Sequence, residues 1–262
     1  MNKNESGATY RFVDRSWKKV DLGIQLRLVD ERRQSILLVH GQPGCGTKWG
    51  PLPLRLSSRF DVFSYDRPGW GESVGRARDV IENAELLNSI VAKMTISLGQ
   101  VPIVLAYSYG ATIAIRALAT EPSRFTEVLL IAPAMSPLAI NRYDKVLALP
   151  IIGVATAFFT SLFSLKYIGT GVKEIFKSTK SLRIEAKNLL TELVNMPKCD
   201  LSSLKLAILA GTSDFVTPPG SIYDGAKKYS ISSIEWLNGA SHLLPWRNSD
   251  AILLFAERSL KL

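Results

Sequence analysis

Residues 106–110 read Ala-Tyr-Ser-Tyr-Gly and lie between two segments of contrasting pattern. The residues before them, 101–105, form a short apolar run typical of a buried strand, whereas 111–118 are small and apolar, as in a helix packed on a sheet. An abrupt strand-to-helix turn leaves no room for bulk two residues either side of its centre, and an alanine and a glycine occupy those positions here. We therefore expect Ser108 in a strained conformation at a helix N-terminus, where backbone N–H groups can stabilise negative charge.

Short apolar runs recur along the chain and alternate with helical patterns. The spacing of apolar residues predicts a helix over 81–98, and alternation over 8–30 predicts a half-buried antiparallel hairpin or meander. Further runs that read as strands are found at 35–39, 60–65, 128–131, 204–210 and 231–237. This order predicts an α/β fold, with a doubly wound, mostly parallel sheet and helices on both faces. Catalytic residues in such a sheet belong at the carboxyl ends of the strands.

The rhythm of strands and helices is interrupted over 136–200, which contain helical stretches and no convincing strand. At 262 residues, the chain is long enough for one large domain with an inserted subdomain. We therefore predict a core formed by 1–135 and 201–262, with 136–200 inserted as a helical lid.

Composition indicates a globular protein, with 47% hydrophobic and 21% charged residues. The net charge of +9 comes from scattered basic residues without a recognisable nucleic-acid-binding motif, so nucleic acid is not expected as a partner. Cys45 and Cys199 form neither a disulfide framework nor a metal-binding pair and are interpreted as free thiols. Together with a polar N-terminus that lacks an apolar signal segment, they predict a cytoplasmic location.

A hydrolytic serine needs a base, and the chain contains only two histidines, His40 and His242. Each lies in a glycine-containing turn that follows an apolar run. In sheets of this kind the nucleophile, the acid and the histidine follow one another in that order along the chain, and only His242 comes late enough. We therefore predict His242 as the base, with His40 as the alternative.

The base needs a carboxylate to fix its tautomer, and Asp214 follows the end of the run at 204–210. Asp66 is the rival, because it follows the run at 60–65. It precedes Ser108, however, and begins a Pro/Gly loop whose tight turns need its side-chain acceptor. We therefore interpret Asp66 as structural and predict Asp214 as the acid.

The oxyanion that forms when the serine attacks the carbonyl requires N–H donors, and two backbone groups are placed to supply them. Tyr109 directly follows the nucleophile, and Gln42 lies in the turn His-Gly-Gln-Pro-Gly at 40–44. We predict that the backbone N–H groups of Tyr109 and Gln42 form the oxyanion hole, without a role for the glutamine side chain. This chemistry calls for no metal and no cofactor.

These motifs resemble the α/β-hydrolase fold superfamily, in particular its lid-bearing branch. The resemblance spans about 17–260 and includes the turn at 40–44, the segment Asp-Arg-Pro-Gly-Trp-Gly-Glu-Ser at 66–73, the nucleophile elbow, and the acid and histidine turns. The family's elbow is Gly-x-Ser-x-Gly, and Ala106 departs from it by one methyl group, which the turn should tolerate. Related haloalkane dehalogenases and epoxide hydrolases carry aspartate at the elbow, so Ser108 argues against both activities.

Residues 146–165 contain no charge and would be long enough to span a membrane. Pro150 and Gly153 interrupt this run, and a stripe of small or polar residues lies along it, so we favour a lid helix packed over an active site. Residues 166–187 then hold six basic and two acidic residues, a pattern that also fits peripheral membrane contact through the lid. Under either interpretation the lid supplies an apolar wall of the pocket.

The sequence therefore predicts a serine hydrolase that acts on a small-molecule acyl substrate, an uncharged and largely apolar ester or a related compound. The resemblance also allows a carbon–carbon bond hydrolase, a lactonase or a perhydrolase with the same triad, and Arg142 and Arg183 are available to bind a charged substrate. A non-catalytic ligand-binding protein on the same fold is a further alternative, although such relatives usually lose a triad residue. The natural substrate and the oligomeric state are left open.

Overall fold

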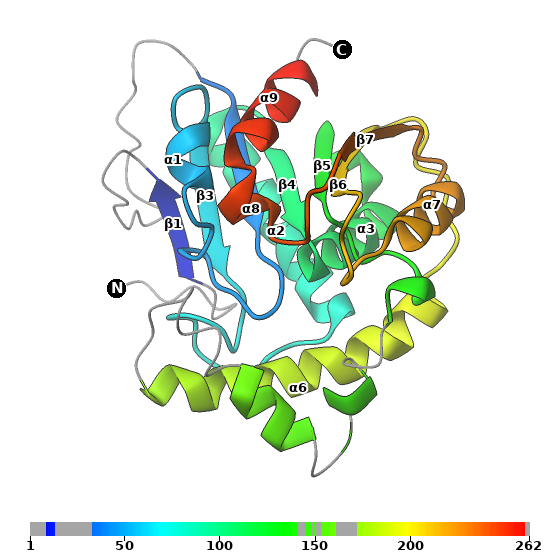
Figure 1. Ribbon diagram of the computed structural model, residues 1–262. Helices are drawn as coiled ribbons and strands as arrows, with labels where there is room; N and C mark the ends of the chain where they lie inside the picture. Colours follow the sequence, from blue (N-terminus) through cyan, green and yellow to red (C-terminus); the bar gives the residue numbers. More distant parts are fainter. Residues whose placement is uncertain are drawn as a thin grey trace.

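The computed structural model describes residues 9–13, 33–140, 145–147, 149, 153–160 and 172–259 (Figure 1). A seven-stranded sheet lies at its centre, with the strand order β1-β3-β2-β4-β5-β6-β7. Neighbouring strands are parallel except for β1, which pairs with β3 in the antiparallel direction. The strands are β1 Thr9–Val13, β2 Ser35–Val39, β3 Asp61–Asp66, β4 Ile103–Tyr107, β5 Glu127–Ile131, β6 Lys205–Gly211 and β7 Ser233–Leu237. The predicted mostly parallel sheet is confirmed.

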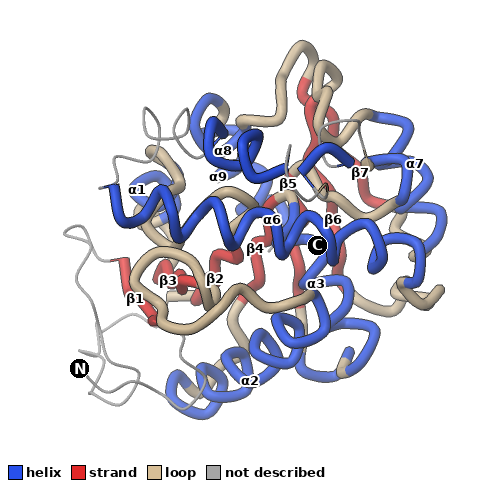
Figure 2. The backbone as a smooth tube through the Cα atoms, turned by 90° about the horizontal axis from the view of Figure 1, so that it is seen from below, coloured by secondary structure: helices blue, strands red, loops and turns tan. Residues whose placement is uncertain are grey.

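Helices cover both faces of this sheet. The helices are α1 Leu52–Leu56, α2 Val80–Leu98, α3 Tyr109–Thr120, α6 Val172–Asn195, α7 Pro219–Lys228, α8 Leu244–Arg247 and α9 Ser249–Ser259. In β2, Leu37 and Val39 face the core that contains side chains of α2, α3 and α7, whereas Ile36 and Leu38 face the core that contains those of α1, α8 and α9. Figure 2 shows α2 and α3 on one side of the strands and α1, α8 and α9 on the other. The sheet is therefore doubly wound, as predicted.

Two local features set the ends of α2, the helix that precedes β4. Asp79 accepts a hydrogen bond from the backbone N–H of Glu82, whose carboxylate accepts in return from the backbone N–H of Asp79. At the other end Gly99 adopts a left-handed conformation with a φ of 66°, which ends the helix. The chain then enters β4 and arrives at Ser108.

The structure differs from the sequence prediction at two strands. β4 begins two residues later than the predicted run at 101–105 and continues to Tyr107. Pro102 explains the late start, because proline has no N–H to donate to the ladder. The hairpin predicted over 8–30 is described only at β1, which pairs with β3, and 14–32 lie outside the described residues.

Between β5 and β6 the described residues contain no strand. They form the 3-10 helix η2 Pro137–Ala139, helical segments at 145–147 and 153–160, and the long helix α6. Figures 1 and 2 both show α6 running across one end of the sheet. Much of the uncharged run at 146–165 lies outside the described residues; among those that are described, no helix is long and apolar enough to cross a membrane.

Candidate active site

Ser108 lies at the turn between β4 and α3, as predicted. Its φ of 53° places a non-glycine residue in the left-handed region, a strain of about 1–3 kcal/mol. A Cβ atom at Gly110 would lie only 2.3 Å from the backbone oxygen of Val39, so glycine is required there. Ala106 is fully buried in β4, where it pairs with Val39 of β2, and the elbow accommodates its methyl group.

The three predicted triad side chains converge at the carboxyl ends of β4, β6 and β7. The Nε2 atom of His242 lies 3.0 Å from the Oγ atom of Ser108, and its Nδ1 atom lies 2.8 Å from the Oδ2 atom of Asp214. Both separations are hydrogen-bond distances. Because an ionised Asp214 can only accept, Nδ1 carries the proton and Nε2 is left to accept the proton of the Ser108 hydroxyl. This is the arrangement that a general base requires.

Asp214 is held as a carboxylate by the turn that follows β6. Its Oδ1 atom accepts hydrogen bonds from the backbone N–H groups of Val216, at 2.8 Å, and Thr217, at 2.9 Å. Its Oδ2 atom accepts from the Thr217 hydroxyl as well as from His242. Burial opposes ionisation, but the hydrogen bonds from His242 and Thr217 outweigh it, so the pKa of Asp214 is lowered. Asp214 is therefore charged at neutral pH.

Two further residues support the base and were not singled out by the sequence. The Tyr107 hydroxyl donates to the backbone oxygen of His242 at 3.1 Å, and the two ring centroids lie 5.2 Å apart. Burial, aided by the charge of Asp214, raises the pKa of Tyr107, so the phenol keeps its proton. The Thr217 hydroxyl lies 2.8 Å from Oδ2 of Asp214 and 3.4 Å from Nδ1 of His242. Only the place of Thr217 in the turn after an aspartate offers a sequence signal.

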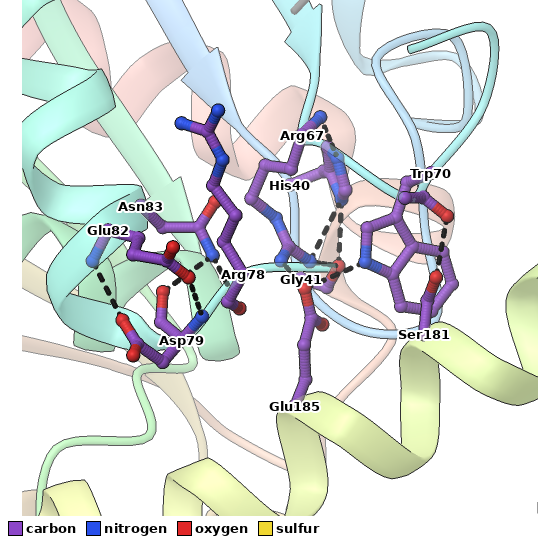
Figure 3. Close-up of polar contacts among 11 residues, drawn as sticks. His40, Gly41, Arg67, Trp70, Arg78, Asp79, Glu82, Asn83, Ser181 and Glu185 are labelled. Atoms are coloured by element: carbon purple, nitrogen blue, oxygen red, sulfur yellow. Dashed lines mark hydrogen bonds and ion pairs between the residues drawn. The ribbon is translucent and has the colours of Figure 1, made fainter. Parts of the chain in front are cut away.

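His40, the alternative base, has both ring nitrogens engaged by backbone groups (Figure 3). Its Nδ1 atom lies 2.8 Å from the backbone oxygen of Gly41, and its Nε2 atom accepts from the backbone N–H of Arg67 at 3.2 Å. This pattern places the proton on Nδ1. Burial, together with the charge of Arg67, lowers the pKa of His40 well below 6.5. His40 is therefore a neutral structural residue, and the geometry favours His242 as the base.

The lowered pKa of His40 predicts that the protein loses stability in mild acid. Below about pH 6.5 the unfolded chain binds a proton at this position that the folded chain does not, so the free energy of unfolding falls as the pH falls. The expected slope is at most about 1.4 kcal/mol per pH unit, and it ends at the pKa of the folded state. Urea unfolding between pH 5 and pH 7.5 measures this slope.

Two variants separate His40 from other groups that titrate. His40→Gln should remove this part of the slope, whereas His242→Ala should retain it. Arg67 and Glu185 face His40 in the same buried cluster. Burial raises the pKa of Glu185, against the opposing effect of Arg67, so protonation of Glu185 would stabilise the folded state in acid and act in the opposite direction. An unchanged slope in His40→Gln would contradict the assignment.

Asp66, the rival acid, is fully buried in the loop that follows β3. Its Oδ1 atom accepts from the backbone N–H of Gly46 at 2.6 Å, and its Oδ2 atom accepts from the backbone N–H of Glu72 at 2.9 Å. The side chain thus links two loops through their backbone groups. The interpretation of Asp66 as a structural turn residue is confirmed.

The two predicted oxyanion donors belong to segments that meet at the nucleophile. Tyr109 directly follows Ser108 as the first residue of α3. Gln42 lies in the turn after β2, the strand next to β4 in the sheet. A Cβ atom at Gly41 would lie 3.0 Å from the Cβ atom of Ser108, so the backbone of this turn passes directly beside the nucleophile. The role of the two N–H groups stays a prediction that this proximity supports.

Both cysteines are free, as predicted. Cys45 is buried and Cys199 is partly buried, and burial raises the pKa of each thiol. Within the ranges that the structure describes, no three His, Cys, Asp or Glu side chains are grouped so as to hold a metal ion.

Comparison with known proteins gives a family and a set of similar folds. The model of the alpha/beta hydrolase family matches residues 36–256. Among curated proteins, no sequence matches the chain. A thermophilic esterase from Thermogutta terrifontis is 17% identical with a TM-score of 0.66, and the match covers 87% of this chain and 89% of the esterase chain. A monoacylglycerol lipase from Paleococcus ferrophilus is 20% identical with a TM-score of 0.57, and the match covers 87% of this chain and 97% of the lipase chain.

Enzymes with other activities share the same architecture. A haloalkane dehalogenase from Bradyrhizobium elkani is 13% identical with a TM-score of 0.65, and the match covers 87% of this chain and 90% of the dehalogenase chain. At identities this low, the likeness to all of these structures is one of fold.

Proposed function

The chain belongs to the alpha/beta hydrolase family, and from that premise we propose that it is a carboxylesterase-like serine hydrolase acting on uncharged, largely apolar acyl esters. In this proposal Ser108 attacks the ester carbonyl while Nε2 of His242 accepts the hydroxyl proton. Backbone N–H groups of Gln42 and Tyr109 stabilise the oxyanion. Asp214 keeps the imidazole in the correct tautomer and stabilises its charge.

The same groups complete acylation and then carry out deacylation. His242 returns its proton to the departing alcohol, and the acyl group stays on Ser108 as an ester. A water molecule then gives a proton to His242 and attacks the acyl carbon. His242 finally returns that proton to the Ser108 oxygen as the carboxylic acid leaves.

One observation carries the proposal. Ser108, His242 and Asp214 are joined by two hydrogen bonds, with donor–acceptor separations of 3.0 and 2.8 Å. A ligand-binding protein needs no hydrogen bond between a strained serine and an oriented imidazole. The elbow strain at Ser108 likewise has no purpose in packing alone.

Two exposed apolar residues that directly follow Asp214 in sequence favour an apolar substrate. Phe215, which follows Asp214 directly, is 87% exposed, and Val216 is 43% exposed. Serine at the elbow, where related dehalogenases and epoxide hydrolases have aspartate, favours acyl transfer over those two activities.

We also propose that 136–200 act as the lid. α6 is fixed to the loop that follows β3, so the helix lies at the end of the sheet where the triad is assembled. Trp70 of that loop forms a small apolar cluster with Leu147, Ala157, Leu182 and Ala186 of the inserted segment. These contacts support a lid that packs on the core beside the active site.

A series of p-nitrophenyl esters with acyl chains from acetate to dodecanoate tests the proposed substrate class. We expect kcat/KM to rise by about four-fold for each added methylene until the pocket is filled, because each buried CH₂ contributes about 0.8 kcal/mol. A spectrophotometric assay of nitrophenolate release gives these values directly.

A dienone acid of the ring-fission type is the matched comparison. Turnover of this compound by a protein that is inactive on every ester would favour carbon–carbon bond hydrolysis. Folded protein that hydrolyses neither, and that a fluorophosphonate fails to label, would show that the proposed function is wrong.

A further inference from the structure

Three side chains of α6 hold the helix against the loop at 66–73. Lys177, Ser181 and Glu185 are spaced four residues apart and therefore share one face of the helix. The Lys177 ammonium donates to three backbone oxygens of the loop, at 2.5, 2.8 and 3.5 Å, and the Ser181 hydroxyl donates to a fourth at 2.6 Å. Glu185 differs from the other two, because it contacts side chains rather than the backbone.

Glu185 forms a buried ion pair with Arg67, seen at the centre of Figure 3. Both side chains are fully excluded from solvent. The same carboxylate oxygen of Glu185 accepts from the indole N–H of Trp70 at 2.7 Å, whereas its second oxygen has no hydrogen-bond partner among the described residues. A buried ion pair is a poor way to gain stability, since apolar residues of similar size are often equally good or better. The pair therefore calls for a purpose other than docking.

The second terminal nitrogen of the Arg67 guanidinium contacts the turn beside the nucleophile. Its Nη2 atom donates to the backbone oxygen of Gly41 at 2.9 Å, and Nδ1 of His40 lies 2.8 Å from the same oxygen. Two donors thus fix this carbonyl group in one direction. The Gly41 carbonyl and the Gln42 N–H belong to one planar, trans peptide unit, so they point in opposite directions. Any group that orients the carbonyl also orients the N–H.

We propose that Glu185 is a positioning residue for the oxyanion hole, acting from α6 through Arg67 on the peptide between Gly41 and Gln42. This inference rests on the proposed function, in which the Gln42 N–H binds the oxyanion. The Glu185 carboxylate holds the guanidinium in place, the guanidinium holds the Gly41 oxygen, and the Gln42 N–H is turned toward the reacting carbonyl. The charge of Arg67 on the carbonyl also polarises the peptide and strengthens the opposite N–H as a donor. Docking of α6 and assembly of the oxyanion hole are thereby one event.

Glu185→Gln tests this role, and Ser181→Ala is its matched control on the same helix face. The glutamine keeps an oxygen for Trp70 but loses the charge that holds Arg67. We expect kcat for p-nitrophenyl butyrate to fall by about 10- to 100-fold with KM changed by less than about two-fold, which is less than the loss of about 100- to 1,000-fold on removing an oxyanion donor. In Ser181→Ala, which removes only a docking hydrogen bond, kcat should change by less than about two-fold.

A second variant guards against simple misfolding, because Glu185→Gln leaves the Arg67 charge buried and unpaired. The double variant Arg67→Met/Glu185→Leu removes both charges and should fold, as judged by circular dichroism and urea unfolding. We expect it to show the same loss of kcat as Glu185→Gln. Normal turnover by the folded double variant would overturn the proposal, and so would an equal loss in Ser181→Ala, which would make helix docking the cause.

A readout that needs no activity keeps this inference separate from the proposed function. The amide resonance of Gln42 in ¹⁵N-labelled protein should shift or broaden in Glu185→Gln and in the double variant, and should stay unchanged in Ser181→Ala. If the wild-type protein were inactive on all esters yet gave this NMR result, the proposed function would be wrong and the positioning by Glu185 would stand. An unchanged Gln42 resonance in both charge variants would rule out the positioning role.

Discussion

Ser108→Ala is expected to lower kcat for ester hydrolysis by about 10⁴- to 10⁶-fold, because no acyl-enzyme can form without the hydroxyl group. The Oγ atom lies 3.0 Å from its base, and no other hydroxyl is described at hydrogen-bond distance from Nε2 of His242. The variant should fold at least as stably as the wild type, since the strain at the elbow is a property of the backbone and alanine adds no bulk. A fluorophosphonate probe should label the wild type once per chain and leave Ser108→Ala unlabelled.

The serine next to His242 in sequence provides the control. Ser241→Ala changes one hydroxyl in the same region and should keep both turnover and labelling. Folded Ser108→Ala that still hydrolyses esters at a tenth of the wild-type rate would contradict the assigned nucleophile. A label found by mass spectrometry on any residue other than Ser108 would contradict it as well.

The convergence of the three proposed triad side chains could be predicted because the fold class restricts where reactive groups can lie. Once parallel strands are recognised, a serine, an aspartate and a histidine that each follow a strand must meet at one edge of the sheet. The order of Ser108, Asp214 and His242 along the chain then decides between two histidines and two aspartates. Local backbone needs give the rest of the elbow, since only glycine fits at position 110.

The support of the site could not be predicted in the same way, because it depends on contacts between distant segments. Arg67 and Glu185 lie 118 residues apart in sequence, and no local pattern joins them. Glu185 lies among the basic residues of 166–187, where no local pattern marks it as buried, yet its carboxylate is fully buried. The role of Tyr107 could not be predicted either, because a tyrosine at the end of a strand is expected to pack as an apolar ring. Its hydroxyl instead donates a hydrogen bond to the backbone oxygen of His242.

Asp214→Asn is expected to lower kcat/KM by about 10⁴-fold, although it changes only one atom. The Asp214 side chain uses Oδ1 to accept from two backbone N–H groups, of Val216 and Thr217, so the oxygen of an asparagine must take that position. The NH₂ group then faces His242 and donates to Nδ1. The imidazole must carry its proton on Nε2 in consequence, and Nε2 can no longer accept the proton of Ser108. Steady-state kinetics on the best ester measures the loss.

Comparison with Asp214→Ala distinguishes a tautomer effect from the loss of a negative charge. Alanine removes the charge too, but it donates nothing to Nδ1, so the imidazole can still adopt the tautomer that leaves Nε2 free to accept. If the tautomer matters most, the nearly isosteric asparagine should be at least as damaging as alanine, against the usual rule that smaller changes cost less. Asparagine with ten times the activity of alanine would instead show that Asp214 acts through its charge, or merely by filling its site. The three hydrogen bonds that Val216 and Thr217 donate to this carboxylate would then serve the fold of the turn rather than the base.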